Sequence, residues 1–259
     1  MNHRSENLPI DEMKVRHYDG SAAHSVKDRI IRELPVDIFI NGNKTITIAC
    51  AGIHLEELAA GFLRSEGIIK TSGDIENIDV TYDMDAVHLS IRGHHGTSRD
   101  RSIFSSGARE TISGTQRKAL TTTTRIAASH ARELMANHLA STVLHSMTHG
   151  THCTSLFDAD GTMIISREDI GRHNTFDMIG GYALMEDMDC SDRIIATTGR
   201  VSSEILFKVW KLGIPIILSH AVPTSRAITT AETAGITIIG YMRNQTMRVY
   251  THEERVIFL

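Results

Sequence analysis

The second half of the chain alternates short apolar runs with stretches of helical periodicity. This alternation limits the available folds more than any other feature of the sequence. Strands that are joined through helices lie parallel in one sheet, with right-handed crossovers. Nearly continuous apolar runs are typical of strands that are covered on both faces. The pattern therefore predicts an α/β domain with a mostly parallel sheet. Its predicted strands are residues 193–198, 215–219, 236–241 and 247–251, and its predicted helices are residues 202–212 and 224–234.

Turn signals and periodicity divide the rest of the chain into further elements. Asn41-Gly42 and Asp160-Gly161 each separate two short apolar runs, which predicts two hairpins. Helical spacing predicts helices at residues 54–66 and 126–145, and apolar alternation predicts strands at 36–40, 45–49, 75–80, 86–91, 153–158 and 162–167.

Residues 93–125 are rich in Gly, Ser, Thr and Arg and show no apolar period, which predicts a long mobile loop. We therefore expect three parts: an N-terminal α+β unit at residues 1–92 with a frayed start at Met1–Lys14, the loop at 93–125, and the α/β domain at 126–259.

Composition is ordinary for a globular protein and excludes several classes of function. Hydrophobic residues make up 41% of the 259 residues and charged residues 22%. The net charge of −4 argues against a nucleic-acid interface, because such surfaces carry a basic excess. No apolar run is long enough to span a bilayer, and the polar N-terminus lacks a signal-peptide pattern, so we expect a cytoplasmic protein without membrane contact. Cys50, Cys153 and Cys190 form no C-x-x-C pair, which argues against a disulfide framework and a structural zinc site.

The run from Ser166 to Gly181, SREDIGRHNTFDMIGG, joins an acidic pair and a polar cluster to the start of an apolar-periodic stretch. The periodicity places Arg172, His173 and Asn174 on the first turn of a helix. A helix start offers free backbone N–H groups and partial positive charge, which suit a phosphate. The plainer interpretation is that Asp169 or Asn174 caps the helix and that Arg172 pairs with a surface carboxylate.

Two further turns that follow predicted strands are rich in hydrogen-bond donors. Ligands of parallel sheets collect where the strands end and the helix N-termini point. Either turn alone is explained well enough as a helix cap. Two such turns in consecutive βα units, next to the Arg172 turn, favour a phosphate-bearing ligand, and we predict that Arg172, Arg200 and Arg226 converge on one anion site. The candidate binding residues are Gly199, Arg200, Ser202 and Ser203 in the first turn, and Thr224, Ser225 and Arg226 in the second.

Several separate motifs give the chain a resemblance to a known family. They are EDIGRHN within the run above, GRVSSE and VPTSRA in the two turns, and VDIFINGNKTITIACAGIHLEELAAGFLRSEGII, which begins at Val36. With these motifs in this order, the chain resembles the formate dehydrogenase accessory protein family (FdhD, also called NarQ), over most of residues 35–79 and 149–251.

The resemblance implies a fold and a ligand. The fold is a cytidine-deaminase-like three-layer sandwich, and homodimers are common among such proteins. Deaminases hold zinc with H-x-E and P-C-x-x-C. The chain has His54-Leu55-Glu56 but no P-C-x-x-C run, so neither zinc nor another metal site is expected.

The implied ligand is a molybdenum bis(molybdopterin guanine dinucleotide) cofactor. It receives sulfur from a cysteine desulfurase before its insertion into formate dehydrogenase. The family's cofactor-contact run corresponds to Tyr241, Met242, Arg243, Asn244, Gln245 and Thr246, although a polar hairpin turn also explains Asn244-Gln245.

One family motif is missing. The family usually carries a C-G-x-C-G run in the region of the long loop, and its cysteines are taken to hold sulfur as a persulfide. The corresponding residues here are Ser105, Ser106, Gly107, Ala108 and Arg109. Serine cannot hold a sulfane sulfur, because the chemistry needs a polarisable thiolate.

Cys153 is the remaining candidate sulfur carrier, since it follows His152, which could help to stabilise a thiolate. A lone cysteine at a strand start, however, is more often a small buried apolar side chain. Two functions stay open: cofactor binding with sulfuration, and cofactor binding without sulfur transfer.

Overall fold

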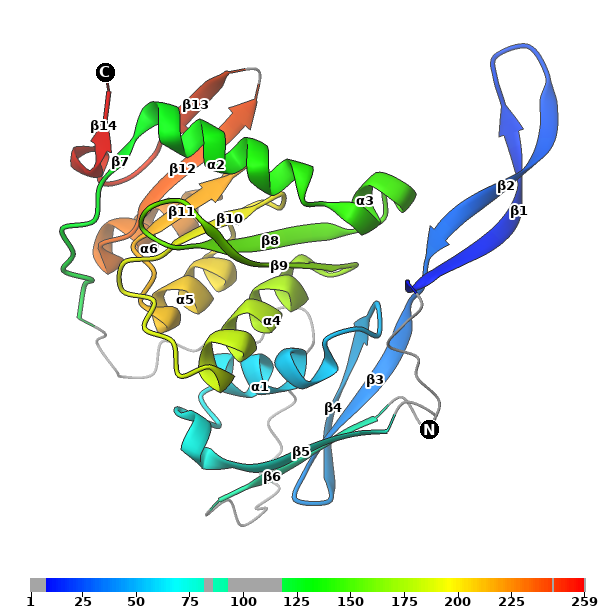
Figure 1. Ribbon diagram of the computed structural model, residues 1–259, viewed down its shortest axis with the longest axis horizontal. Helices are drawn as coiled ribbons and strands as arrows, with labels where there is room; N and C mark the ends of the chain where they lie inside the picture. The colour runs from blue at the N-terminus through cyan, green and yellow to red at the C-terminus, as the bar shows by residue number, and fades with distance from the viewer. Residues whose placement is uncertain (1–7, 82–85, 93–117, 244, 259) are drawn as a thin grey trace.

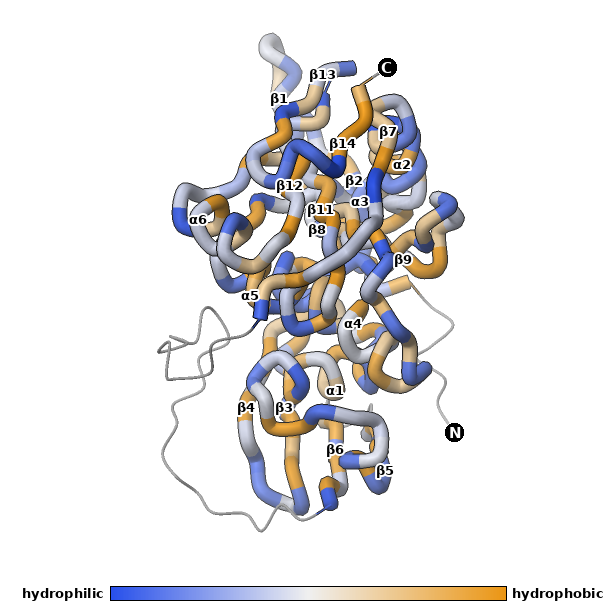
Figure 2. The backbone as a smooth tube through the Cα atoms, turned by 90° about the vertical axis from the view of Figure 1, so that its left-hand side faces the viewer, coloured by the Kyte–Doolittle hydropathy of each residue, from blue (hydrophilic) through white to orange (hydrophobic). Residues whose placement is uncertain are grey.

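The computed structural model describes residues 8–81, 86–92, 118–243 and 245–258 (Figure 1). A six-stranded sheet with helices on both faces forms the larger part, and a four-stranded sheet with one helix lies beside it. A two-stranded hairpin extends away from both (Figure 1). Figure 2 shows that apolar residues gather along the strands of the two sheets and that polar residues are frequent in the turns.

The six-stranded sheet is mixed. Its strand order is β13-β12-β11-β10-β8-β9. Only the pairs β10–β11 and β11–β12 are parallel, while β8–β9, β10–β8 and β12–β13 are antiparallel. The prediction of a mostly parallel sheet is therefore wrong, because short hairpin turns join β8 to β9 and β12 to β13, and such turns impose antiparallel pairing. The strands are β8 (His152–Phe157), β9 (Met163–Asp169), β10 (Ile194–Thr197), β11 (Ile216–Ser219), β12 (Thr237–Arg243) and β13 (Thr246–Val249).

Helices cover both faces of this sheet, as the α/β class requires. Helix α2 (Ala128–Ala140) packs on one face, and α4 (Arg172–Met185), α5 (Ser203–Leu212) and α6 (Ser225–Ala234) pack on the other (Figure 1). The likeness to cytidine deaminases stays a prediction. No helix in the described part of the chain has the length and apolar character needed to cross a membrane.

The helix predicted over residues 126–145 is divided into three elements. Residues Ile126–Ala127 form the short strand β7, which pairs in parallel with β14 (Val256–Ile257) after the short 3₁₀ helix η3 (Glu253–Arg255). After α2 the chain restarts as α3 (Val143–Thr148). The Glu168 carboxylate accepts hydrogen bonds of 2.8 Å from the N–H groups of Leu144 and His145, so it caps the new helix.

The N-terminal sheet has the order β4-β3-β6-β5, with β3 and β6 parallel. One helix, α1, covers one face of the sheet and also packs on α4, so the two sheets are joined through a helix pair. The elements are β3 (Leu34–Ile40), β4 (Asn43–Cys50), α1 (Leu55–Ser65), η2 (Ser72–Asp74), β5 (Ile75–Thr81) and β6 (Ala86–Ile91).

A hairpin of β1 (Ile10–Tyr18) and β2 (Ala23–Ile31) forms an arm that extends from the body (Figure 1). The prediction of a frayed start at Met1–Lys14 is therefore wrong from Ile10 onward, and residues 1–7 lie outside the described residues. Asp19-Gly20 marks the turn: the Asp19 carboxylate accepts hydrogen bonds from the N–H groups of Ser21 and Ala22. The mobile loop predicted at 93–125 lies outside the described residues as far as 117. Its end runs along α5 and α6, where the Leu120 N–H donates to the carbonyl of Ala234.

Candidate functional site

The two turns predicted to bind a ligand lie side by side where β10 and β11 end. Val201 of the first turn forms a parallel bridge with Pro223 of the second, and the Thr224 N–H donates to the Val201 carbonyl at 2.9 Å. The Ser219 hydroxyl, at the end of β11, donates to the Gly199 carbonyl at 2.9 Å. The topology that joins these strands therefore fixes the two turns against each other.

Two hydroxyl groups of these turns act as helix caps. The Ser202 side chain accepts from the N–H of Ile205 at the start of α5, and the Thr224 side chain accepts from Ala227 at the start of α6. The interpretation of each turn as a helix cap is thus correct for these two hydroxyls. Ser203 and Ser225 begin the same two helices.

The start of α4 adjoins the first turn. A Cβ atom on Gly199 would lie 3.3 Å from Arg172 Cβ and 3.6 Å from His152 Nδ1, so the first turn packs closely against both side chains. Arg172 Nε is buried and has no hydrogen-bond partner among the described residues. Arg200 and Arg226 are exposed on the two joined turns. Convergence of the three guanidinium groups on one anion stays a prediction.

Of the two residues that follow Arg172, Asn174 already has hydrogen-bond partners within the part of the chain that the structure describes, and the His173 ring nitrogen Nε2 has none there. The Asn174 amide donates to the Ala49 carbonyl at 2.8 Å and to Asp169 Oδ1 at 2.7 Å, which ties α4 to β4. His173 Nε2 is buried and lies 3.1 Å from a carboxylate oxygen of Glu204, without the geometry of a hydrogen bond. Burial, together with nearby Lys208 and Arg172, lowers the pKa of His173 to about 4, so this contact is made by a neutral ring at neutral pH. The predicted binding residue Asn174 therefore has its amide committed to the protein interior.

The acidic pair in the same run also serves the fold. Glu168 caps α3, and Asp169 accepts hydrogen bonds from the N–H groups of Ala51 and Gly171. Burial raises the pKa of Asp169 to about 6, against the effect of these hydrogen bonds and of the one from Asn174. Asp169 thereby connects the N-terminal unit to the start of α4.

The predicted cofactor-contact run forms the end of β12 and its turn into β13. Tyr241 adopts a left-handed backbone conformation with φ of 53°, which is unusual for an aromatic residue, at an irregularity in the strand register. Its ring lies 4.4 Å from the guanidinium carbon of Arg248 and 5.8 Å from that of Arg243. Arg243 Nε donates to the His220 carbonyl at 3.2 Å, so the run borders the turn after β11. Asn244 lies outside the described residues.

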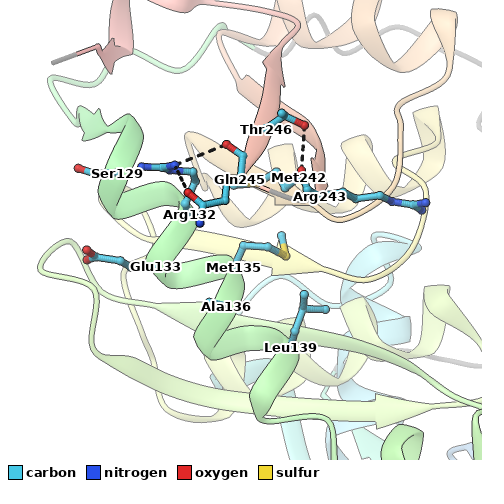
Figure 3. Close-up of a pocket in the computed structure, with 10 residues that line it drawn as sticks. All are labelled: Ser129, Arg132, Glu133, Met135, Ala136, Leu139, Met242, Arg243, Gln245 and Thr246. Atoms are coloured by element: carbon cyan, nitrogen blue, oxygen red, sulfur yellow. Dashed lines mark hydrogen bonds between the residues drawn. The ribbon is translucent and has the colours of Figure 1, made fainter.

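A groove of about 370 Å³ separates this run from α2 (Figure 3). Met135, Leu139 and Met242 give it an apolar floor, a composition typical of small-molecule sites. Arg132 crosses the groove and donates to the carbonyl and side-chain oxygens of Gln245 at 3.5 and 3.4 Å. The lining residues are Ser129, Arg132, Glu133, Met135, Ala136 and Leu139 of α2, and Met242, Arg243, Gln245 and Thr246 of the run. The wall from α2 was not predictable from the sequence, because its residues are remote from the run along the chain and show only the apolar spacing of a helix.

All three cysteines of the chain are buried. Cys153 faces α2, where its Sγ lies 3.1 Å from Ser166 Oγ and 3.9 Å from His138 Nδ1. Burial raises the pKa of Cys153 to about 11. His152 points to the opposite face of the sheet, because side chains alternate along a strand, so it cannot assist the thiol. These observations favour the interpretation of Cys153 as a small buried side chain.

Within the ranges that the structure describes, no group of three or more histidine, cysteine and acidic side chains is placed to hold a metal ion. Two histidines that follow one another along α2 and α3 have hydrogen-bond partners within the protein: His138 bonds to Ser155 at 2.7 Å, and His145 bonds to the Thr151 carbonyl at 2.8 Å.

Comparisons with known proteins agree with the motifs quoted above. Residues 31–257 match the model of the FdhD/NarQ family. A "sulfur carrier protein FdhD" of Bacillus subtilis is 31% identical over 253 residues, covering 93% of this chain and 95% of the relative. The protein of the same name from Listeria innocua is 34% identical over 263 residues, covering 95% and 98%.

A solved structure shares the fold. The crystal structure of a candidate formate dehydrogenase accessory protein from Desulfotalea psychrophila matches with a TM-score of 0.78 at 23% identity, covering 96% of this chain and 99% of the other. The family model spans residues 31–257, and the two sulfur carrier relatives, both above 30% identity, align over more than nine-tenths of the chain. This chain belongs to the FdhD/NarQ family.

Proposed function

We propose that this protein binds the molybdenum bis(molybdopterin guanine dinucleotide) cofactor as its cargo and assists formate dehydrogenase maturation. The observation that carries the proposal is the match to sulfur carrier proteins of the FdhD family over more than nine-tenths of the chain. The residues present are compatible with such a cargo. The groove beside Met242 offers an apolar floor to a planar ring system, Arg132 and Arg243 stand at its rim, and the turns at Arg172 and Arg200 supply donors for phosphates.

The state of the cysteines favours the second candidate function, in which the protein binds the cofactor and transfers no sulfur through a thiol of its own. A persulfide carrier needs a reachable thiolate. All three cysteines are buried, and burial raises the pKa of both Cys153 and Cys190 to about 11. A cysteine desulfurase, formate dehydrogenase and a second copy of the chain remain the partners that the family resemblance implies.

Guanine nucleotides test the binding proposal. We expect GDP to bind the wild-type protein and Arg200→Ala to weaken binding by roughly 1.5–3 kcal/mol, which is about 10- to 150-fold, because a charged hydrogen bond to phosphate is lost. The matched control is Arg193→Ala, which removes the same charge before the opposite end of β10 and should leave the affinity unchanged. Isothermal titration calorimetry measures both. Absence of GDP binding, or equal weakening by the two substitutions, would count against the site.

Thiol chemistry separates the two candidate functions. After incubation with a cysteine desulfurase and cysteine, we expect no persulfide on the native protein. We also expect native alkylation of Cys153 to be at least ~100-fold slower than in denaturant, because its raised pKa suppresses the thiolate. Alkylation followed by peptide mass spectrometry measures both quantities. A persulfide that maps to Cys153 and disappears in Cys153→Ala would restore the sulfur-transfer function.

A further inference from the structure

Two histidines face each other near the tip of the arm formed by β1 and β2. His17 and His24 are direct cross-strand partners, and their ring centroids are 5.2 Å apart at an interplanar angle of 65°. Both residues are exposed. The short turn that begins at Asp19 joins the two strands, and its hydrogen bonds fix the register that holds the pair together.

The spacing of the rings suits two ligands of one metal ion. Imidazole binds Zn²⁺ with Zn–N distances of about 2.0–2.1 Å, and two imidazoles on a tetrahedral ion have ring centres roughly 5 Å apart. The observed separation of 5.2 Å matches this value without a change in the backbone. The hairpin also fixes one ligand at a high effective concentration relative to the other.

The charges of the arm leave this position open to a cation. Side chains alternate between the two faces of a strand pair, so His17 and His24 share a face with Val15 and Val26. The basic residues lie on the other face, which keeps their positive charge away from the pair. They are Lys14, Arg16, Lys27 and Arg29.

We propose that His17 and His24 form a bidentate site for a divalent transition-metal ion of the Zn²⁺, Ni²⁺ or Cu²⁺ class. Imidazole suits these ions, whereas Mg²⁺ and Ca²⁺ prefer oxygen ligands. Two protein ligands leave the remaining coordination positions to water or to a group from a second molecule. The missing P-C-x-x-C run argues against a deaminase-type zinc site, and the histidine pair on the arm does not depend on that motif.

A second histidine pair provides an internal control. The rings of His145 on α3 and of His149, which follows the helix, are 5.6 Å apart, also in an edge-to-face arrangement, but His145 Nδ1 already contacts the Thr151 carbonyl at 2.8 Å. His149→Ala therefore removes an imidazole from a similar pair at the base of the arm, where Gly150 packs on Ile31, at the opposite end of β2 from His24.

Titration of the full-length protein with ZnCl₂, followed by calorimetry and by the histidine ring signals in NMR, tests the proposal. We expect His17→Ala and His24→Ala each to weaken one binding event at least about tenfold, and the double variant to weaken it little further, because either loss abolishes chelation. His149→Ala should leave this event unchanged, and MgCl₂ should not produce it. Cross-strand NOEs between Val15 and Val26 show that the arm stays paired in each variant. Unchanged zinc binding in His17→Ala, or equal loss in His149→Ala, would overturn the proposal.

Discussion

Replacing Gly181 by alanine should destabilise the protein by at least about 3 kcal/mol, since α1 and α4 cross with their backbones in contact. A Cβ atom at position 181 would lie 1.9 Å from the carbonyl oxygen of Glu57, far inside contact distance. Gly61 of α1 meets α4 in the same way, 1.8 Å from the Asp177 carbonyl oxygen. Neither neighbour is a flexible side chain, so the helices must separate to admit a methyl group. Denaturation by urea measures the free energy of unfolding.

The adjacent glycine provides the matched control. A Cβ atom on Gly180 would lie 3.6 Å from a methyl group of Leu212, which is ordinary contact. Alanine favours a helix interior by about 1 kcal/mol over glycine, so Gly180→Ala should be neutral or slightly stabilising. A loss below about 1 kcal/mol in Gly181→Ala, or equal losses in the two variants, would show that the helices are not in backbone contact.

This crossing also shows what the sequence could not predict. The L-E-E-L-A-x-G-F-L run predicted a helix, and the structure has α1 at Leu55–Ser65. The apolar period does not predict the close backbone contacts at Gly61 and Gly181, because the partner of each glycine is more than 100 residues away in the chain. The start of α3 also depends on a residue outside the helix, Glu168 in β9, which lies 24 residues further along the chain than Leu144.

Local signals succeeded where neighbouring residues determine the structure. Asn41-Gly42 and Asp160-Gly161 marked real hairpins, and the strand–helix alternation after residue 193 gave three parallel strands. Asp19-Gly20 carries the same turn signal, but β1 and β2 contain so many charged residues that they show no clear alternation of apolar and polar residues. An arm without a core of its own shows little apolar periodicity.

The candidate site was predictable in outline. The two turns do meet, because consecutive parallel strands end at the same edge of a sheet. The roles of single side chains were less predictable: Asn174 and Ser202 have donors and acceptors that suit a ligand, yet they bind Ala49 and Ile205 within the protein. The groove needed α2 as a second wall, and only tertiary packing places that helix.

Acid should destabilise the protein through His138, whose ring is buried between α2 and the sheet. Burial lowers the pKa of His138 from 6.5 to about 4, and His220 adds to the effect. Between these two values the unfolded chain binds a proton that the folded protein does not, so stability falls as the pH falls through this window. The difference between the two pKa values corresponds to about 3 kcal/mol of unfolding free energy, of which about 2 kcal/mol is lost when the pH falls to 5.

The comparison of wild type with His138→Gln isolates this contribution. Asp169, with a pKa raised to about 6, changes stability in the opposite direction: the folded state holds its proton longer, so stability falls as pH rises from 3.8 to 6. That contribution is the same in both proteins and cancels in the difference, as distant sites are nearly additive. Urea denaturation from pH 7.5 to 5 should show a loss smaller by about 2 kcal/mol in His138→Gln.

His173 supplies an independent repeat of the measurement, since its pKa is also lowered to about 4 and it lies on α4, which packs on the face of the sheet opposite to α2. His173→Gln should reduce the loss of stability between pH 7.5 and 5 by a similar amount. The double variant should reduce it by the sum of the two effects, because two protons that bind only to the unfolded chain are then removed instead of one. Parallel stability curves for wild type and His138→Gln would mean that the ring takes up a proton within the folded protein. The His138 ring signal in NMR would then titrate near pH 6.5 instead of staying constant down to pH 5.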